Sequence, residues 1–349
     1  MSEQVVKASC TAIQARIRAL HIAGRMLADT LTVSLYLTLA CGRSCPDSKV
    51  KGANGSLETN SATARQGSPQ LLVRQRNVRV EFGIHALEMD PADGGRIVEF
   101  SLNGRNVIIP KDESPEGFGS SFWPSPQKDW SGPPPAEFDK LPWNVTLDGN
   151  SVTLESRIVQ KTDLSARQRI TPIPSLSAIG IVYQITNHSN EPRQVAPWQT
   201  TRVRPKGMTF FPSHEPSFPE STLALAPSEG IIWYTHKPAD IDRSVTSLVD
   251  GQEGWMAQVD GHLLFVKAFP DVARVDLAPE SGEVIIHAHA SARFLEIEQQ
   301  GEYTELPPGQ TLTWPVFFVL QVIPETTEIR VGNPQLVSMA RRMACSVRP

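Results

Sequence analysis

Residues 94–107 read GGRIVEFSLNGRNV, a short run of alternating side chains that ends in an Asn-Gly pair before a second short run. Alternation of apolar and polar residues is typical of a strand with one buried face. Gly104 can take the positive φ that a tight hairpin turn requires. The segment therefore predicts a strand, a turn and a second strand.

The same pattern continues along the chain, with Asp-Gly, Asn-Gly and Pro-Pro-Gly turns between the runs. No helical period appears between Val73 and Pro324, and no glycine-rich phosphate loop follows a strand, which disfavours Rossmann and P-loop enzymes. We predict an all-β fold, a large antiparallel β-sandwich over residues 71–334. The other predicted strands are Val78–Phe82, Val152–Glu155, Ile179–Thr186, Leu263–Phe269, Val284–His289, Phe294–Glu298 and Leu312–Val322.

The composition is that of an ordinary globular protein. Of the 349 residues 20% are charged and 40% hydrophobic, and the formal charge is -4, so we expect no nucleic-acid partner. The 29 prolines are about 8% of the chain, against a usual level of roughly 5%. Because proline cannot donate to a sheet or continue a helix, this excess favours short strands joined by rigid loops.

An export signal is predicted at residues 1–41. Leu31–Ala40 is apolar, too short to span a bilayer, preceded by basic residues and ended by small ones. The tetrapeptide TLAC resembles a bacterial lipoprotein cleavage box with its leucine one place too close to Cys41, so lipidation of Cys41 is a hypothesis. Two alternatives stay open: a true start at Met26, and an ordinary amphipathic helix near the N-terminus.

The segments that flank the sandwich are predicted to form a disordered tether on one side and a short helix or tail on the other. Residues 42–70 are polar and nearly devoid of apolar side chains, which indicates a disordered tether. Residues 335–349 are expected to form a short helix or tail, with the helix over Pro334–Arg342. We expect an exported protein of the periplasm or cell envelope, with possible membrane attachment through a lipid on Cys41. No histidine cluster accompanies Cys41 and Cys45, so we predict neither a metal nor a cofactor.

Several segments carry a resemblance to a known superfamily. GGRIVEFSLNGRNV resembles the first hairpin of aldose 1-epimerases, and further segments continue the match in order at residues 119–130, 196–203, 209–212, 250–255, 266–270 and 295–301. Together they resemble an uncharacterised bacterial branch, of the DUF4380 type, of the galactose-mutarotase-like superfamily. The resemblance implies a supersandwich with a sugar cleft on its concave face, while the branch implies no particular activity.

Glu298 is the candidate general base. Mutarotation needs a base that takes the anomeric hydroxyl proton and an acid that protonates the ring oxygen. The superfamily places the base in a pattern like Glu-Thr-Gln on a late strand, and residues 298–300, Glu-Gln-Gln, resemble that pattern. Glu296 is expected on the same strand face. The alternative is that Glu298 is an outward carboxylate on an edge strand.

The general acid is not where the resemblance implies, because Trp198 occupies the position of the expected histidine. His188 lies in a polar turn and His214 in a loop, and both are more typical of exposed histidines. His287 and His289 share one face of a strand and could bind a metal, but without an evident third ligand solvated strand histidines are favoured.

Aromatic and multi-donor side chains gather in the same segments, within polar loops braced by proline. Indole rings stack on the C–H faces of sugars, and planar polar groups bind sugar hydroxyls. The alternatives are burial of each tryptophan in the core and, for Arg202, an ion pair with Glu298. A lysine at position 267 needs a partner if it points inward. The predicted substrate-binding residues are Trp123, Gln127, Trp130, Trp198, Gln199, Arg202 and Lys267.

The leading functional hypothesis is an exported carbohydrate-binding protein. The alternative is an aldose 1-epimerase that uses Glu298 as its base. A weaker alternative is a polysaccharide-cleaving enzyme with Glu296 or Glu298 in a carboxylate pair. A structural envelope protein is also compatible with the fold, because fold alone does not determine function.

Overall fold

The computed structural model describes residues 68–74, 76–213, 223–237, 243–289 and 293–348. The predicted export signal, Cys41, the tether up to residue 67 and His214 lie outside these residues. The described residues form two large antiparallel sheets, so the prediction of an all-β sandwich is confirmed. Within this part of the chain no helix is long and apolar enough to cross a membrane.

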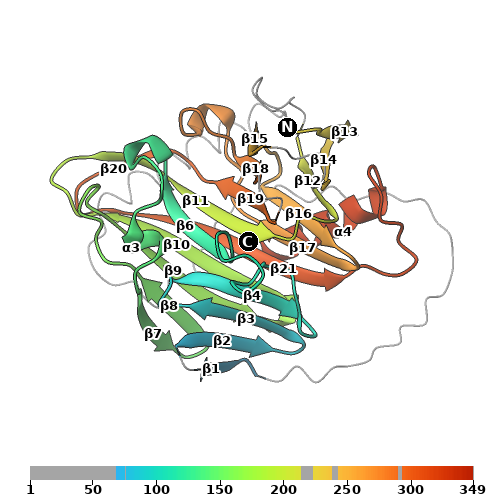
Figure 1. Ribbon diagram of the computed structural model, residues 1–349, viewed down its shortest axis with the longest axis horizontal. Helices are drawn as coiled ribbons and strands as arrows, with labels where there is room; N and C mark the ends of the chain where they lie inside the picture. Colours follow the sequence, from blue (N-terminus) through green and yellow to red (C-terminus); the bar gives the residue numbers. More distant parts are fainter. Residues whose placement is uncertain (1–67, 75, 214–222, 238–242, 290–292, 349) are drawn as a thin grey trace, which may run out of the picture. The chain divides into compact units, whose positions relative to one another are not determined.

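One sheet contains 11 strands among the described residues. β5 (Arg105–Asn106) pairs with β4 and β20 (Thr304–Leu306) pairs with β11. In Figure 1 the blue to teal strands β2, β3 and β4 lie side by side at one end of this sheet. The other strands follow in this spatial order: β1 (Gln70–Arg74), β2 (Asn77–Phe82), β3 (His85–Asp90), β4 (Arg96–Leu102), β6 (Ser120–Ser125), β11 (Arg193–Val203), β19 (Leu295–Gln300), β18 (Val284–Ala288) and β15 (Val245–Val249).

The second sheet contains 10 strands in the part of the chain that the structure describes. Short helices interrupt the strands: η1 (Gln127–Asp129), α3 (Ala136–Asp139), η2 (Pro174–Leu176) and η4 (Arg274–Asp276). The spatial order of the strands is β13 (Ala226–Ser228), β14 (Ile231–Thr235), β12 (Met208–Pro212), β16 (Trp255–Asp260), β17 (Leu263–Ala268), β21 (Thr311–Val322), β10 (Ala178–Asn187), β9 (Leu164–Ile173), β8 (Ser151–Glu155) and β7 (Asn144–Asp148).

The hairpin predicted from residues 94–107 is β4 and β5. Leu102 pairs with Arg105, and the turn residues Asn103 and Gly104 have φ of 49° and 75°, the left-handed region that the Asn-Gly pair favours. Gly94 also has a positive φ, and a Cβ there would lie 2.5 Å from the backbone of Asp139. Glycine is therefore required where the start of the hairpin meets α3.

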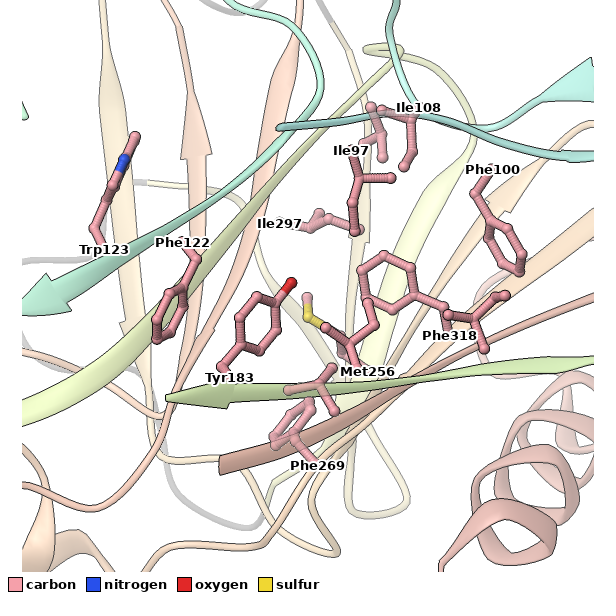
Figure 2. Close-up of a cluster of buried hydrophobic side chains, with 14 of the residues drawn as sticks. Ile97, Phe100, Ile108, Phe122, Trp123, Tyr183, Met256, Phe269, Ile297 and Phe318 are labelled. Atoms are coloured by element: carbon pink, nitrogen blue, oxygen red, sulfur yellow. The ribbon is translucent and has the colours of Figure 1, made fainter. Parts of the chain in front are cut away.

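Apolar side chains of both sheets form the core between them. Phe122 of β6 stacks on Tyr183 of β10 with their ring centroids 4.3 Å apart. Phe100 of β4 meets Phe265 and Phe318 of the other sheet at 5.7 and 6.0 Å. Figure 2 shows Phe122, Tyr183, Phe100 and Phe318 within this cluster. These contacts identify which face of each strand is turned toward the other sheet.

The C-terminal helix α4 (Pro334–Val347) is longer than the predicted Pro334–Arg342. Asn333 caps its start, accepting a hydrogen bond from the backbone of Gln335 at 2.8 Å, and Pro334 fits the first turn. Leu336, Ala340, Met343, Ala344 and Val347 are buried against β16, β17 and β21. The helix continues past Arg342 because this apolar spacing covers the face of the 10-stranded sheet that is turned away from the core.

The core contact between Phe122 and Tyr183 gives a stability prediction. Phe122 is 2% exposed, so Phe122→Ala should lower the free energy of unfolding by about 3–5 kcal/mol, measured by urea denaturation. The control is Val275→Ala, since Val275 is 89% exposed and its truncation should change that free energy by less than about 0.5 kcal/mol. Equal effects of the two substitutions would contradict this description of the core.

Candidate functional site

The candidate site lies on the distal face, defined as the face of the 11-stranded sheet that is turned away from the 10-stranded sheet. Phe122 and Ile297 point into the core, so their neighbours Trp123 and Glu298 project from the distal face, because successive side chains alternate along a strand. Figure 2 shows Phe122 and Trp123 extending in opposite directions. The residues at the centre of the distal face are Ser121, Trp123, Trp198, Thr200, Arg202, His287, Glu296, Glu298 and Gln300.

Strand pairing brings these residues together from distant parts of the sequence. On β11, Trp198 lies across from Gln300 of β19, Thr200 across from Glu298, and Arg202 across from Glu296. On the other side of β11, Trp198 lies across from Trp123 of β6. His287 of β18 lies across from Glu296. The centre of the distal face therefore combines carboxyl, guanidinium, imidazole, amide and indole groups.

Glu298 is buried in the middle of the sheet. β19 pairs with β11 on one side and β18 on the other, and Glu298 is 3% exposed. The interpretation of Glu298 as a solvated carboxylate on an edge strand is therefore wrong. The indole nitrogen Nε1 of Trp198 donates a hydrogen bond to Glu298 Oε2 at 2.5 Å, which fixes the orientation of the carboxyl group.

Burial and, to a smaller extent, the negative charge of Glu296 raise the pKa of Glu298 from its ordinary value of 4.5 to about 8. The hydrogen bond from Trp198 and the charges of Arg202 and Lys267 oppose this shift. Desolvation dominates because an ionised carboxylate loses its hydration inside the protein. Glu298 is therefore a proton-carrying acid at neutral pH, in contrast to an ordinary surface glutamate.

Arg202 pairs with Glu296. Its Nε donates to Glu296 Oε1 at 2.8 Å, and its Nη2 lies 2.8 Å from the same oxygen. Nη1 donates to the hydroxyl of Ser121 at 2.8 Å, and the guanidinium carbon lies 5.1 Å from the ring centroid of Trp123. The ion pair of Arg202 is thus formed with Glu296, whereas the sequence suggested Glu298. Held on three sides, Arg202 has a fixed position beside Trp123.

Three tryptophans form one aromatic cluster. Trp198 lies 5.3 Å from Trp123, edge to face, and 6.3 Å from Trp130, stacked. The prediction that the tryptophans lie in proline-braced loops is wrong for two of them: Trp123 is on β6 and Trp198 on β11. Pro124 and Pro197 are also strand residues and lie across from each other. Trp130 follows η1, and its Nε1 donates to the carbonyl of Pro124 at 2.9 Å.

The other predicted binding residues lie apart from the distal face. Gln199 faces the sandwich interior, where its Nε2 donates to Thr201 Oγ1 at 2.8 Å and its Oε1 accepts from Gln299 at 2.7 Å. Alternation along β11 requires this direction, because Gln199 lies between Trp198 and Thr200. Gln127 is exposed on η1. Neither side chain is brought to Glu298.

Lys267 also points into the interior and is 0% exposed. Its Nζ donates to the carbonyl of Ile297 at 2.9 Å, so it reaches β19 from the core side while Glu298 leaves that strand on the distal side. Burial lowers the pKa of Lys267 well below its ordinary value, and the charge of Glu298 opposes the shift. Burial thus favours the neutral forms of both groups.

Three buried polar atoms on the distal face have no hydrogen-bond partner among the described residues. They are the Oε1 of Gln300, the Oγ1 of Thr200 and the Nε1 of Trp123. Gln300 is 3% exposed and Thr200 is 0% exposed. A buried polar atom without a partner is destabilising, by about 1–3 kcal/mol. The centre of the distal face thus holds a buried amide oxygen, a hydroxyl and an indole N–H that the described part of the protein leaves unpaired.

His287 lies on the same distal face as Glu298, a placement that the sequence did not predict. It lies across from Glu296 and diagonally across from Glu298, and its Nδ1 lies 2.7 Å from the hydroxyl of Thr246. Burial lowers its pKa below the ordinary 6.5, against the charge of Glu296. Only the register between β18 and β19 sets position 287 against position 296, and the alternation within either segment does not contain that register.

Two other histidines considered as candidates, His188 and His289, have partners away from Glu298. His188 is exposed, and its Nε2 lies 2.8 Å from the hydroxyl of Ser165. His289 stacks on Phe294 with a centroid distance of 4.7 Å. No group of three or more His, Cys, Asp or Glu residues suited to a metal ion occurs among the residues that the structure describes.

Comparison with known proteins shows likeness at the level of the fold. No family model matches the sequence, and no curated protein matches it. A TPR-domain containing protein from Parabacteroides distasonis is 12% identical over 73% of this chain and 49% of its own, with a TM-score of 0.50. A galactose mutarotase-like protein from Lactobacillus casei is 9% identical over 73% of this chain and 100% of its own, with a TM-score of 0.49. Galactose 1-epimerase from Lactobacillus acidophilus is 10% identical over 74% of this chain and 99% of its own, with a TM-score of 0.49.

The raised pKa of Glu298 predicts a pH-dependent stability. The unfolded chain releases this proton near pH 4.5, whereas the folded chain holds it to about pH 8. Glu298 therefore makes its full contribution to the free energy of unfolding below pH 4.5. That contribution falls between pH 4.5 and about 8 and is constant at higher pH. Glu298→Gln cannot ionise, so its free energy of unfolding relative to the natural protein should rise across this window, by on the order of a few kcal/mol.

Urea denaturation at a series of pH values measures this difference. Glu305→Gln is the matched control, because Glu305 is an exposed glutamate on the same sheet. The control should show no such rise. A Glu298→Gln difference that stays flat between pH 4.5 and 8 would contradict the raised pKa.

Proposed function

We propose that this chain is a carbohydrate-binding protein and that the sugar lies against the distal face beside Trp198. The observation that carries the proposal is the set of buried, unpartnered polar atoms of Gln300, Thr200 and Trp123 around Glu298. Sugar hydroxyls both donate and accept hydrogen bonds, so one ring can satisfy amide, hydroxyl and indole groups together. An apolar ligand would leave all three unsatisfied.

The tryptophan cluster supplies the apolar half of such a site. Trp198 is only partly buried, while Trp123 and Trp130 behind it are 6% and 4% exposed. Aromatic rings offer large, rigid contact surfaces for the C–H face of a sugar. Trp198 is held by its hydrogen bond to Glu298 and by its two neighbouring rings, so its surface is preorganised for binding.

The charged groups fit a neutral, polyhydroxylated ligand at this position. Arg202 and Glu296 neutralise each other, and protonated Glu298 can donate a hydrogen bond as well as accept one. Because desolvation favours the neutral carboxylic acid, a sugar can approach without displacing a strongly hydrated charge.

We also propose a superfamily and a cellular location for this protein. We assign the chain to the galactose-mutarotase-like superfamily, and to its DUF4380-type branch, on the segments between residues 94 and 301. The apolar run Leu31–Ala40 supports export to the periplasm or cell envelope, and Cys41 is the proposed site of a lipid that attaches the protein to a membrane.

Removal of the partly buried indole of Trp198 tests the binding site. Trp198→Ala should weaken binding of a sugar identified on a neutral monosaccharide and glycan panel by at least about tenfold, because stacking and one side of the site are lost. Isothermal titration calorimetry measures the affinity. The control is Trp143→Phe. The indole of Trp143 is buried away from the distal face and donates a hydrogen bond to the carbonyl of Glu137.

The control should leave the sugar affinity unchanged within about twofold, even if it lowers stability. Thermal unfolding of both variants separates misfolding from loss of the site. Absence of binding by the natural protein to every sugar of the panel would reject the proposed function.

A second candidate function, aldose 1-epimerase activity, is favoured by one observation: Glu298 and His287 lie diagonally across from each other on neighbouring strands. Diagonal neighbours in an antiparallel sheet are about 7–8 Å apart at their α-carbons. With Glu298 protonated and His287 neutral, Glu298 gives a proton to the ring oxygen while His287 takes one from the anomeric hydroxyl. Ring closure reverses both transfers, with Glu298 then acting as the base.

This candidate predicts a catalytic defect in two variants. Glu298→Gln and His287→Gln should each slow anomer exchange by about 10²–10⁴-fold, since each removes one proton-transfer group. Polarimetry or NMR exchange spectroscopy on freshly dissolved aldoses measures the rate, and exposed Glu305→Gln should retain full activity. If the natural protein accelerates no aldose in the panel, this second function is rejected while binding stands.

A further inference from the structure

A separate cavity adjoins Trp130 at one end of β6 and β11. Its volume is about 470 Å³, within the range of roughly 300–1,000 Å³ found for small-molecule sites. Its walls come from η1, from residues 161–164 and from the start of β11, and they include Tyr303. None of the distal-face residues around Glu298 lines it, so the cavity is a distinct feature of the fold.

Two polar atoms in the cavity wall lack partners among the described residues. Thr162 is 8% exposed, and its Oγ1 is buried without a hydrogen bond. The Nε of Arg193, another lining residue, is likewise buried without one. Both residues line the cavity, and a ligand that carries oxygen acceptors suits the hydroxyl and the guanidinium that they contribute.

The lining is positively charged. Lys128, Lys161 and Arg193 contribute cations, and Asp129 is the only carboxylate among the described lining residues. Lys161 is anchored by donating from Nζ to the carbonyl of Trp130 at 2.9 Å. Among the described residues the side chain of Arg193 has only a long contact of 3.5 Å to Asp163, with both side chains about half exposed, so its guanidinium is available to a stronger partner.

The cavity also offers an apolar wall and a connection to the distal face. Trp130, Leu164 and Pro126 line it, and the ring of Trp130 stacks on that of Trp198. An aromatic wall combined with excess cations and hydroxyl or phenol groups selects a ring-shaped, oxygen-rich anion. Trp130 thus separates this cavity from the sugar site proposed beside Trp198.

We infer that the cavity at Trp130 is a second binding site and that it takes a carboxylate-bearing sugar, a hexuronate, with Arg193 holding the carboxylate and Thr162 a ring oxygen. The choice of a sugar as the carrier of the carboxylate rests on the proposed carbohydrate-binding function. The existence of an anion site rests on the cavity, its charge and its unpartnered atoms alone.

The test compares galacturonate with galactose, which differ at this point only by the carboxylate. Calorimetric titration of the full chain should give galacturonate an affinity at least about tenfold higher, the effect of one charge-assisted hydrogen-bonded pair. Arg193→Gln should remove this preference, and Thr162→Val should weaken galacturonate binding several-fold. The control Arg330→Gln, an exposed arginine before α4, should keep the preference.

NMR of the indole N–H groups provides a second readout that does not depend on the stability of the variants. Galacturonate should shift the signal of Trp130, which lines the cavity. Equal affinity for the two sugars, or a carboxylate preference that survives Arg193→Gln, overturns the inference.

The same measurements separate failure here from failure of the proposed function. Galactose binding that depends on Trp198 but shows no carboxylate preference removes the second site alone. A galacturonate preference that depends on Arg193, without any binding that depends on Trp198, supports the cavity and removes the first site. Absence of binding by both sugars overturns the inference of a hexuronate site.

Discussion

The pairing of β11 with β19 in the middle of the 11-stranded sheet is the interaction on which the rest of the site depends. It joins two segments about a hundred positions apart and sets Thr200 against Glu298 and Arg202 against Glu296. Because side chains alternate with a period of two, a slip by one residue would turn both carboxyl groups into the core. The register therefore decides whether the chain has a polar site at all.

Interior hydrogen bonds support that register. Gln199 donates to Thr201 and accepts from Gln299, and it also donates to Ser120 of β6, so one amide ties three neighbouring strands together from the core side. Such a network is favourable only in the pairing that satisfies it, since a buried amide without partners is costly. Gln199, predicted as a sugar ligand, is thus found where it stabilises the strand pairing that presents Trp198 on the opposite face.

The sequence predicted strands well where alternation is regular, as in Val78–Phe82 and Leu312–Val322, which correspond to β2 and β21. It assigned Trp123 and Trp198 to loops, because proline within a run normally argues against an inner strand. Lys267 was misleading for another reason: its strand is covered on both faces, so alternation could not give its direction. The closeness of His287 to Glu298 depended on strand register, which periodicity within a single segment does not contain.

Two glutamines show why the distal face is interpreted as a binding surface. Gln199 and Gln300 are both almost fully buried, on adjacent strands of one sheet. Both ends of the Gln199 amide have protein partners, as expected for a residue that contributes to folding. The Oε1 of Gln300 has none among the described residues, although it lies beside Trp198 and follows Glu298 closely on β19. Folding alone favours an apolar residue at such a position, and the ligand proposed for the distal face would supply the partner that the amide oxygen lacks.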